Sequence, residues 1–227
     1  MIDVQDTLAD LVTAGPARAE TLDALDLDYC CHGQRTLIDA CAAAAIDVWD
    51  VVAQLEASDR SASRSTGWAG LGVEALIDHI VTVHHQLLRR EAPRLLELGR
   101  KVRDVHGENH HELFDVVDTL ERLWAELAPH LDEEERETFP ALRSLAGGSA
   151  TSIDLQRLAD DHEAAGALLD RLRRVTASFT VPGDGCASFR AFYAGLAELD
   201  ADTRLHVHKE NNVLFPAVTG SRRRVAS

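Results

Sequence analysis

The chain has 227 residues, of which 45% are hydrophobic, and it carries a formal net charge of −15 at pH 7. This composition is enough to bury one good core and a second, smaller one. The acidic balance argues against a nucleic-acid partner, because no basic surface is large enough to follow a phosphate backbone. No apolar run approaches the length of a membrane-spanning helix, and the first residues do not resemble a signal peptide. We therefore expect a cytoplasmic protein with no membrane partner.

Residues 1–57 are expected to form a small helical domain. Pro16 suits the first turn of a helix, and Thr36 opens a capping-box pattern before another. The polar residues and glycines of the segment 58–70 predict a linker. A domain of this size has a marginal core, so we expect it to lean on its neighbour.

Residues 71–220 are expected to form an antiparallel, up-down four-helix bundle, which makes the whole chain all-α. Short polar or glycine-containing segments separate four long helical patterns, and no alternating, strand-like run occurs. The patterns cover about residues 71–104, 110–145, 152–179 and 185–218. The last residues, 221–227, contain three arginines in a row and are expected to be a basic, solubilising tail.

Two of these helical patterns contain a histidine followed four residues later by a glutamate. The pairs are His130 with Glu134 and His206 with Glu210, and each pair is followed by a Phe-Pro dipeptide. Residues four apart project from one face of a helix, so each imidazole and its carboxylate can bind one ion or two adjacent ions. The repetition suggests a two-fold arrangement of helices around a pair of metal ions.

The other two helical patterns also carry a histidine on the apolar stripe. His162 lies in the middle of the stripe of the third pattern. In the first pattern His84 and His85 lie on neighbouring faces, and periodicity leaves both open as the inward histidine.

A single inward histidine is more often an ordinary core residue than a ligand, but four of them with two glutamates favour a metal site. A buried carboxylate without a partner costs several kcal/mol, and a metal ion removes that cost. Four imidazoles and two carboxylates are too many for one tetrahedral zinc ion. They suit two six-coordinate ions bridged by the carboxylates and an oxygen atom. Nitrogen and oxygen ligands without thiolate favour iron over manganese.

Two further motifs carry a resemblance to a known family. The segment Asp28-Tyr29-Cys30-Cys31-His32-Gly33 resembles the small domain that precedes the bundle in the repair-of-iron-centres family, and the segment His206 to Pro216 resembles a hemerythrin-type bundle. The resemblance covers nearly the whole chain. It implies an all-α bundle with a non-haem di-iron centre that protects or restores iron–sulfur clusters damaged by nitric oxide or peroxide, including by iron donation.

The resemblance also implies which residues bind the iron. It favours His85 over His84, and it assigns Glu134 and Glu210 as bridging carboxylates. The implied ligands are His85, His130, Glu134, His162, His206 and Glu210. Oxygen-carrying hemerythrins have a fifth histidine and an aspartate ligand, and this difference argues against an oxygen carrier. The implied partners are iron–sulfur client proteins or small gases.

Cys30 and Cys31 are the candidate catalytic thiols of the small domain. The Cα atoms of adjacent residues lie only about 3.8 Å apart, so a disulfide between them would be strained, and free thiols are expected. The thiols could accept iron or nitric oxide or engage a client cluster; the alternative is that they only pack the small domain. Glu126 and Asp161 are candidates for outer partners of the histidines or for a polar iron path, against the alternative of a solvated face.

Three other functions remain open on the sequence alone. The chain could be a gas-binding or sensing module for nitric oxide or oxygen, or an enzyme that reduces nitric oxide or peroxide at the iron pair. It could also be a metal-free helical interaction protein. Whether it is an enzyme, and whether it is a monomer or a homodimer, is not determined by these patterns.

Overall fold

The computed structural model describes residues 2–61, 68–149 and 153–220. These residues form helices and no strand, apart from one isolated bridge between Thr7 and Thr36. This confirms the predicted all-α fold. In the same residues, no helix combines the length and the apolar composition needed to cross a membrane. The chain divides into two compact units, which we call the bundle unit (Asp78–Thr203) and the small unit (residues up to Ile77 together with those from Arg204 onward).

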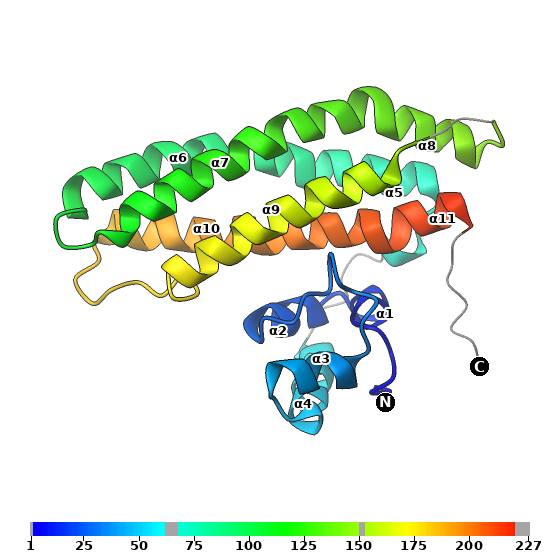
Figure 1. Cartoon of the computed structure of the whole chain (residues 1–227), viewed down its shortest axis with the longest axis horizontal. Coiled ribbons are helices and arrows are strands. Elements are labelled where there is room, and N and C mark those ends of the chain that lie inside the picture. Colours follow the sequence, from blue (N-terminus) through cyan, green and yellow to red (C-terminus); the bar gives the residue numbers. More distant parts are fainter. Residues whose placement is uncertain (1, 62–67, 150–152, 221–227) are drawn as a thin grey trace. The chain divides into compact units, whose positions relative to one another are not determined.

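Long helices that pack lengthwise around one leucine-rich core form the bundle unit (Figure 1). Helix α7 packs against both α6 and α9, and short connections make consecutive helices antiparallel. The long helices are α6 (Gln86–His106), α7 (Glu112–Glu133), α9 (Leu155–Val175) and α10 (Ala187–Lys209), the last of which continues from Thr203 into the small unit.

The core of the bundle unit comes from the apolar stripe of each helix. Leu120, Leu123 and Leu127 of α7 are all buried, and each contributes about 1.5–3 kcal/mol by removal from water. Two glycines, Gly99 of α6 and Gly195 of α10, allow these two helices to lie close together. A Cβ added to Gly99 would lie 2.6 Å from the Phe192 ring, so only glycine leaves room for that ring.

Four short helices with their own core form the amino-terminal part of the small unit. They are α1 (Leu8–Ala14), α2 (Arg18–Ala24), α3 (Leu37–Ala44) and α4 (Val48–Ser61). The side chains of Thr7 and Thr36 accept hydrogen bonds from backbone N–H groups in the first turns of α1 and α3, which fixes where these helices begin. Val207 of α10 belongs to this core, together with Leu22, Leu37 and Leu55.

The compact units differ from the predicted domains. The predicted bundle domain extended to residue 220, whereas the residues from Arg204 onward group with the amino-terminal residues. In the predicted linker 58–70, α4 continues to Ser61 and a short 3₁₀ helix, η1, occupies Trp68–Gly70. The rest of that segment and the predicted basic tail, 221–227, lie outside the described residues. The predicted domain boundaries therefore stay a prediction.

In the part of the chain that the structure describes, three stretches of wider, π-helical backbone interrupt the long helices. They are η2 (Ile80–His85, after α5, Val73–His79), η3 (Glu134–Thr138, before α8, Phe139–Ala146) and η4 (Glu210–Leu214, before α11, Phe215–Thr219). In η3 and η4 the backbone carbonyl of the glutamate, Glu134 or Glu210, accepts a hydrogen bond from the backbone N–H of the phenylalanine five residues later. A proline follows that phenylalanine in both segments. Proline lacks an N–H and crowds the carbonyl one turn earlier, which explains a wider turn at these two places. Nothing in the local sequence explains η2.

Candidate metal centre

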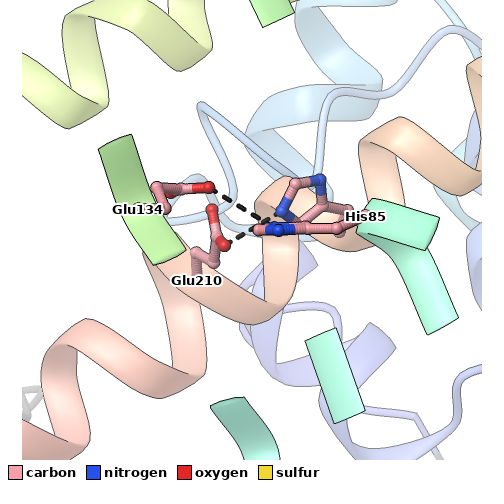
Figure 2. A group of neighbouring side chains, drawn as sticks. His85, Glu134 and Glu210 are labelled. Carbon is pink, nitrogen blue, oxygen red and sulfur yellow. Dashed lines mark hydrogen bonds and ion pairs between the residues drawn. The ribbon is translucent and has the colours of Figure 1, made fainter. Parts of the chain in front are cut away.

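Glu134 is the central residue of a cluster of buried histidines in the bundle unit. Its side chain is 0% exposed, and it begins the π-helical segment η3. One carboxylate oxygen, Oε2, lies 3.4 Å from His85 Nε2, the pair drawn in Figure 2. The other, Oε1, lies 3.2 Å from His130 Nε2 and 3.9 Å from His162 Nε2. The two oxygens thus face two separate sets of imidazole nitrogens, as a bridging carboxylate does.

His130 and His162 form one of these two sets. Their Nε2 atoms lie 3.1 Å apart, and both side chains are buried. Two nitrogens bound to one ion at about 2.1 Å and at a right angle to each other would lie about 3.0 Å apart. The distance between these two nitrogens therefore suits two neighbouring ligands of a single cation.

His85 forms the other set within the bundle unit. Its Nδ1 lies 2.8 Å from Glu135 Oε1, and Arg89 Nη1 donates to the same oxygen at 2.8 Å. The ring stacks on Phe139, with centroids 5.5 Å apart. A carboxylate at Nδ1 places the proton there, so the unprotonated Nε2 faces Glu134 and has the form that a metal ion requires. The sequence patterns did not predict this role for Glu135. The one feature of the sequence that could have indicated it is the position of Glu135 directly after the predicted ligand Glu134.

His84 makes different contacts from its neighbour. Its Nδ1 lies 2.8 Å from Asp202 Oδ1, and its ring meets the edge of the His79 ring at 5.8 Å between centroids. Periodicity left His84 and His85 open, and the contacts separate them. His85 faces Glu134, whereas His84 is a buried histidine with a carboxylate partner of its own.

Glu126 and Asp161, the predicted outer partners, both line a cavity of about 320 Å³ in the bundle unit. The cavity reaches His130 and His162, and Pro129 forms part of its wall. Asp161 Oδ2 lies 3.6 Å from His130 Nδ1, and its side chain is 42% exposed. The cavity joins solvent to the two imidazoles through carboxylate side chains. Pro129 is accommodated inside α7, which continues as a helix to Glu133.

His206 and Glu210 form the second histidine–glutamate pair, and they lie in the small unit. His206 Nε2 and Glu210 Oε1 are 2.9 Å apart, and both side chains are buried. His206 lies on α10, and Glu210 begins η4, so the spacing of four residues holds across the junction of the two segments. The pair therefore has the form that the sequence predicted.

The asparagines that follow Glu210 hold the double-cysteine loop. Asn212 Nδ2 donates to the carbonyl of Cys30 at 2.9 Å and to that of Tyr29 at 3.3 Å, and Asn211 Nδ2 donates to Cys30 O at 3.4 Å. His208 Nδ1 lies 3.3 Å from Tyr29 O, and burial lowers the pKa of His208 to about 4. A neutral His208 therefore donates from Nδ1 to that carbonyl. The sequence patterns gave no indication of this role for Asn211 and Asn212, although both lie in the segment His206 to Pro216.

Cys30 and Cys31, the predicted thiols, do not form disulfides. Their Sγ atoms are 3.7 Å apart; Cys30 is buried, and Cys31 is half-buried. The hydrogen bond to Cys31 and burial raise the pKa of Cys30 well above its ordinary value. Asp28 Oδ1 accepts from the backbone N–H of Cys30 at 2.9 Å and of Cys31 at 3.0 Å. The thiol chemistry that the sequence suggested stays a prediction.

Family comparisons agree with this architecture and this set of residues. Residues 76–218 match the model of the hemerythrin HHE cation binding domain, and residues 4–59 match a domain of unknown function, DUF542. The chain belongs to the hemerythrin HHE family and carries that amino-terminal domain. The family predicted from the double-cysteine segment and the His206 to Pro216 segment is thereby confirmed.

Curated relatives extend the similarity to nearly the whole chain. The chain is 31% identical over 216 residues to a "Probable iron-sulfur cluster repair protein" of Haemophilus influenzae, covering 94% of this chain and 96% of the relative. It is also 31% identical over 210 residues to the "Iron-sulfur cluster repair protein YtfE" of Salmonella paratyphi B and of Salmonella newport, covering 92% of this chain and 94% of each relative.

Proposed function

We propose that this chain is a di-iron protein that repairs or protects iron–sulfur clusters damaged by nitric oxide or by oxidants. The family is a cation-binding one, and relatives that match most of the chain are named for cluster repair. The observation that carries the proposal is the buried Glu134 carboxylate, whose two oxygens face two different sets of imidazoles.

The proposed ligands come from both units. His85, His130, Glu134 and His162 meet in the bundle unit. The pair His206 and Glu210 repeats the relation of His130 to Glu134, on a helix whose earlier turns, at Leu196 and Leu199, belong to the bundle core. We assign these six residues as ligands of two iron ions, with Glu134 and Glu210 as bridges. Manganese suits the same ligand types less well.

The chain's own residues do most of what such a centre needs. Bound iron would supply redox chemistry and affinity for small ligands. The buried setting of Glu134 and the histidines excludes bulk water and strengthens every charge interaction there. Glu135 keeps the proton of His85 at Nδ1, and Arg89 holds that carboxylate in place. The cavity lined by Glu126 and Asp161 offers a polar path for an ion or a small ligand.

The proposal also covers the partners of the chain, its location in the cell and the role of its thiols. The chemistry fits damaged iron–sulfur client proteins in the cytoplasm, where free thiols such as Cys30 and Cys31 persist. These thiols would assist when iron or nitric oxide is exchanged. The chain would act as a monomer or a homodimer.

The test is restoration of a nitrosylated client that holds a [4Fe–4S] cluster. We expect the iron-loaded chain to restore client activity and cluster absorbance, and Glu134→Gln to abolish the effect. Glu137→Gln is the matched control, because Glu137 is exposed on the same π-helical segment. An iron-loaded wild-type chain that leaves the client damaged would refute the proposal.

A second candidate function is the binding or reduction of a small gas or peroxide. The cavity of about 320 Å³ that reaches His130 and His162 favours it, since a diatomic ligand fits easily in that volume. A reversible spectral change with nitric oxide and no effect on clients would indicate a sensor. Several turnovers of nitrous oxide or water formation would indicate an enzyme.

A further inference from the structure

A second group of metal-binding side chains lies in the small unit. Asp28, Cys30 and Cys31 each offer one ligand atom, and these atoms lie within 4.8 Å of one another. We propose that these three residues form a separate, mononuclear site for a divalent cation that prefers thiolate ligands, Zn²⁺ or Fe²⁺. The site is independent of the proposed di-iron centre, because none of its ligands belongs to that set.

The separation of the two sulfurs matches a shared cation. The Sγ atoms lie 3.7 Å apart. A disulfide needs about 2.05 Å. Two thiolates bound to one tetrahedral ion at about 2.3 Å each lie about 3.75 Å apart. The vicinal pair is therefore spaced as one edge of a tetrahedral site and is too far apart to be a disulfide.

Asp28 supplies a third ligand atom in a fixed position. Its Oδ1 accepts from the backbone N–H groups of both cysteines and lies 3.1 Å from Cys30 Sγ. Its other oxygen, Oδ2, lies 2.6 Å from Nδ1 of His32. The carboxylate is thus held on both sides, directly beside the two sulfurs. Binding of a cation would release the two thiol protons to solvent and leave two thiolates and one carboxylate around the ion.

The loop that carries the sulfurs is held from the opposite side as well. Asn212 binds the carbonyls of Tyr29 and Cys30, so the backbone between Asp28 and Cys31 is restrained at its N–H groups and at its carbonyls. A restrained loop loses little conformational entropy when a ligand binds, which favours a real site over a chance cluster.

The site lies beside a cavity and would keep one coordination position open. Asp28 and His32 line a cavity of about 230 Å³, and His32 is 57% exposed. With three protein ligands, a tetrahedral ion keeps a fourth position for water, His32 or a ligand from another molecule. Structural zinc sites have four protein ligands, whereas sites that exchange or react keep one position open. The cation at this site would therefore be exchangeable.

Titration of the full-length chain with Co²⁺ tests the proposal. Thiolate bound to Co²⁺ gives a charge-transfer band in the near ultraviolet, whereas imidazole and carboxylate ligands do not. We expect a band that saturates at about one equivalent of thiolate-bound Co²⁺ per chain. Metal that binds to the histidine–glutamate residues contributes no such band, so a failure of the proposed di-iron centre leaves this test intact.

Substitutions assign the band to its ligands. Cys31→Ser should abolish it, and this half-buried residue is a safer choice than the buried Cys30. Cys186→Ser, which removes the exposed thiol, should leave the band unchanged. Asp28→Asn keeps an oxygen for the two backbone N–H groups but removes the charge, and we expect about a tenfold loss of Co²⁺ affinity.

The outcomes separate the proposal from its alternatives. No thiolate band in the wild-type chain would overturn it, as would a band that survives Cys31→Ser and disappears in Cys186→Ser. Far-ultraviolet circular dichroism of each variant shows whether the fold is intact. Competition then identifies the cation: displacement of Co²⁺ by Fe²⁺ supports an iron site, and displacement by Zn²⁺ alone supports a zinc site.

Discussion

Two segments of the molecule share one design but differ in what they contact. The segments η3 and η4 both have π-helical backbone, begin with a buried glutamate and lead into a Phe-Pro dipeptide. In the bundle unit, the residue after Glu134 is Glu135, which binds His85 and Arg89. In the small unit, Asn211 and Asn212 follow Glu210, and they bind the backbone of the double-cysteine loop.

In η3 and η4 the position of the glutamate relative to its histidine is the same, whereas the residues that follow the glutamate have different partners. A π-helical turn contains one residue more than an α-helical turn, so it rotates the following side chains relative to those before it. The glutamate keeps its histidine at the spacing of four, while the next residues turn towards other partners. In η3 those partners support a histidine, and in η4 they support the segment that carries two thiols.

The largest expected effect is loss of iron when either glutamate is replaced. The wild-type chain should bind about two irons, and Glu134→Gln and Glu210→Gln should each bind one or none, because a bridging carboxylate serves both ions. Iron analysis of the purified variants, with Glu137→Gln as the control, measures this. If only one of the two substitutions lowered the iron content, the two segments would not be equivalent.

A second test compares the adjacent histidines of η2. His85→Asn should lower the iron content, since His85 faces Glu134. His84→Asn should keep the iron. It should instead lower the free energy of unfolding by about 1–3 kcal/mol, because the mostly buried Asp202 carboxylate loses its hydrogen bond with His84. Iron analysis and urea unfolding of both variants separate these outcomes. Equal iron loss in both would mean that His84 is also a ligand.

A third, smaller effect should distinguish the residues that follow the two glutamates. Asn212→Ala removes donors from the Tyr29 and Cys30 carbonyls and should cost about 1–3 kcal/mol of local stability. Glu135→Ala removes the carboxylate partner of the buried His85 Nδ1 and should also cost about 1–3 kcal/mol, but that loss lies in the bundle unit. Hydrogen exchange of the amides of residues 28–32 should accelerate in the first variant and not in the second.

The smallest expected effect concerns the thiols of the two units. Hydrogen bonds from the backbone N–H of Phe189 and from His106 lower the pKa of Cys186 to about 7, whereas the pKa of Cys30 is raised. The thiolate reacts and the thiol does not, so alkylation of Cys186 should rise with pH with a midpoint of about 7. His106→Gln should move that midpoint upwards. Mass spectrometry of iodoacetamide-treated chain follows each cysteine, and a Cys30 that reacts first would contradict this.

The sequence was sufficient to predict the helices and most of the proposed ligands. Spacings of three and four along leucine stripes place His130, Glu134 and His162 on inward faces, and the structure brings them together. The same rule paired His206 with Glu210. These features are local, because helix periodicity alone determines which side chains share a face.

Features that depend on contacts between distant segments could not be predicted. Periodicity did not distinguish His84 from His85, because the choice depends on carboxylates at Asp202 and Glu134, far along the chain. The roles of Glu135 and Asn212 have the same origin. Each π-helical segment adds one residue to a turn and so changes which later side chains share a face with the earlier ones. A pattern based on 3.6 residues per turn does not predict that change.

We proposed above that Glu134 and Glu210 bridge two irons in one centre. Mössbauer and electron paramagnetic resonance spectra of the oxidised, iron-loaded chain test it most directly. We expect about two irons per chain that couple antiferromagnetically, with no resonance from isolated ferric ions. Spectra of uncoupled, mononuclear iron in the fully loaded chain would contradict it.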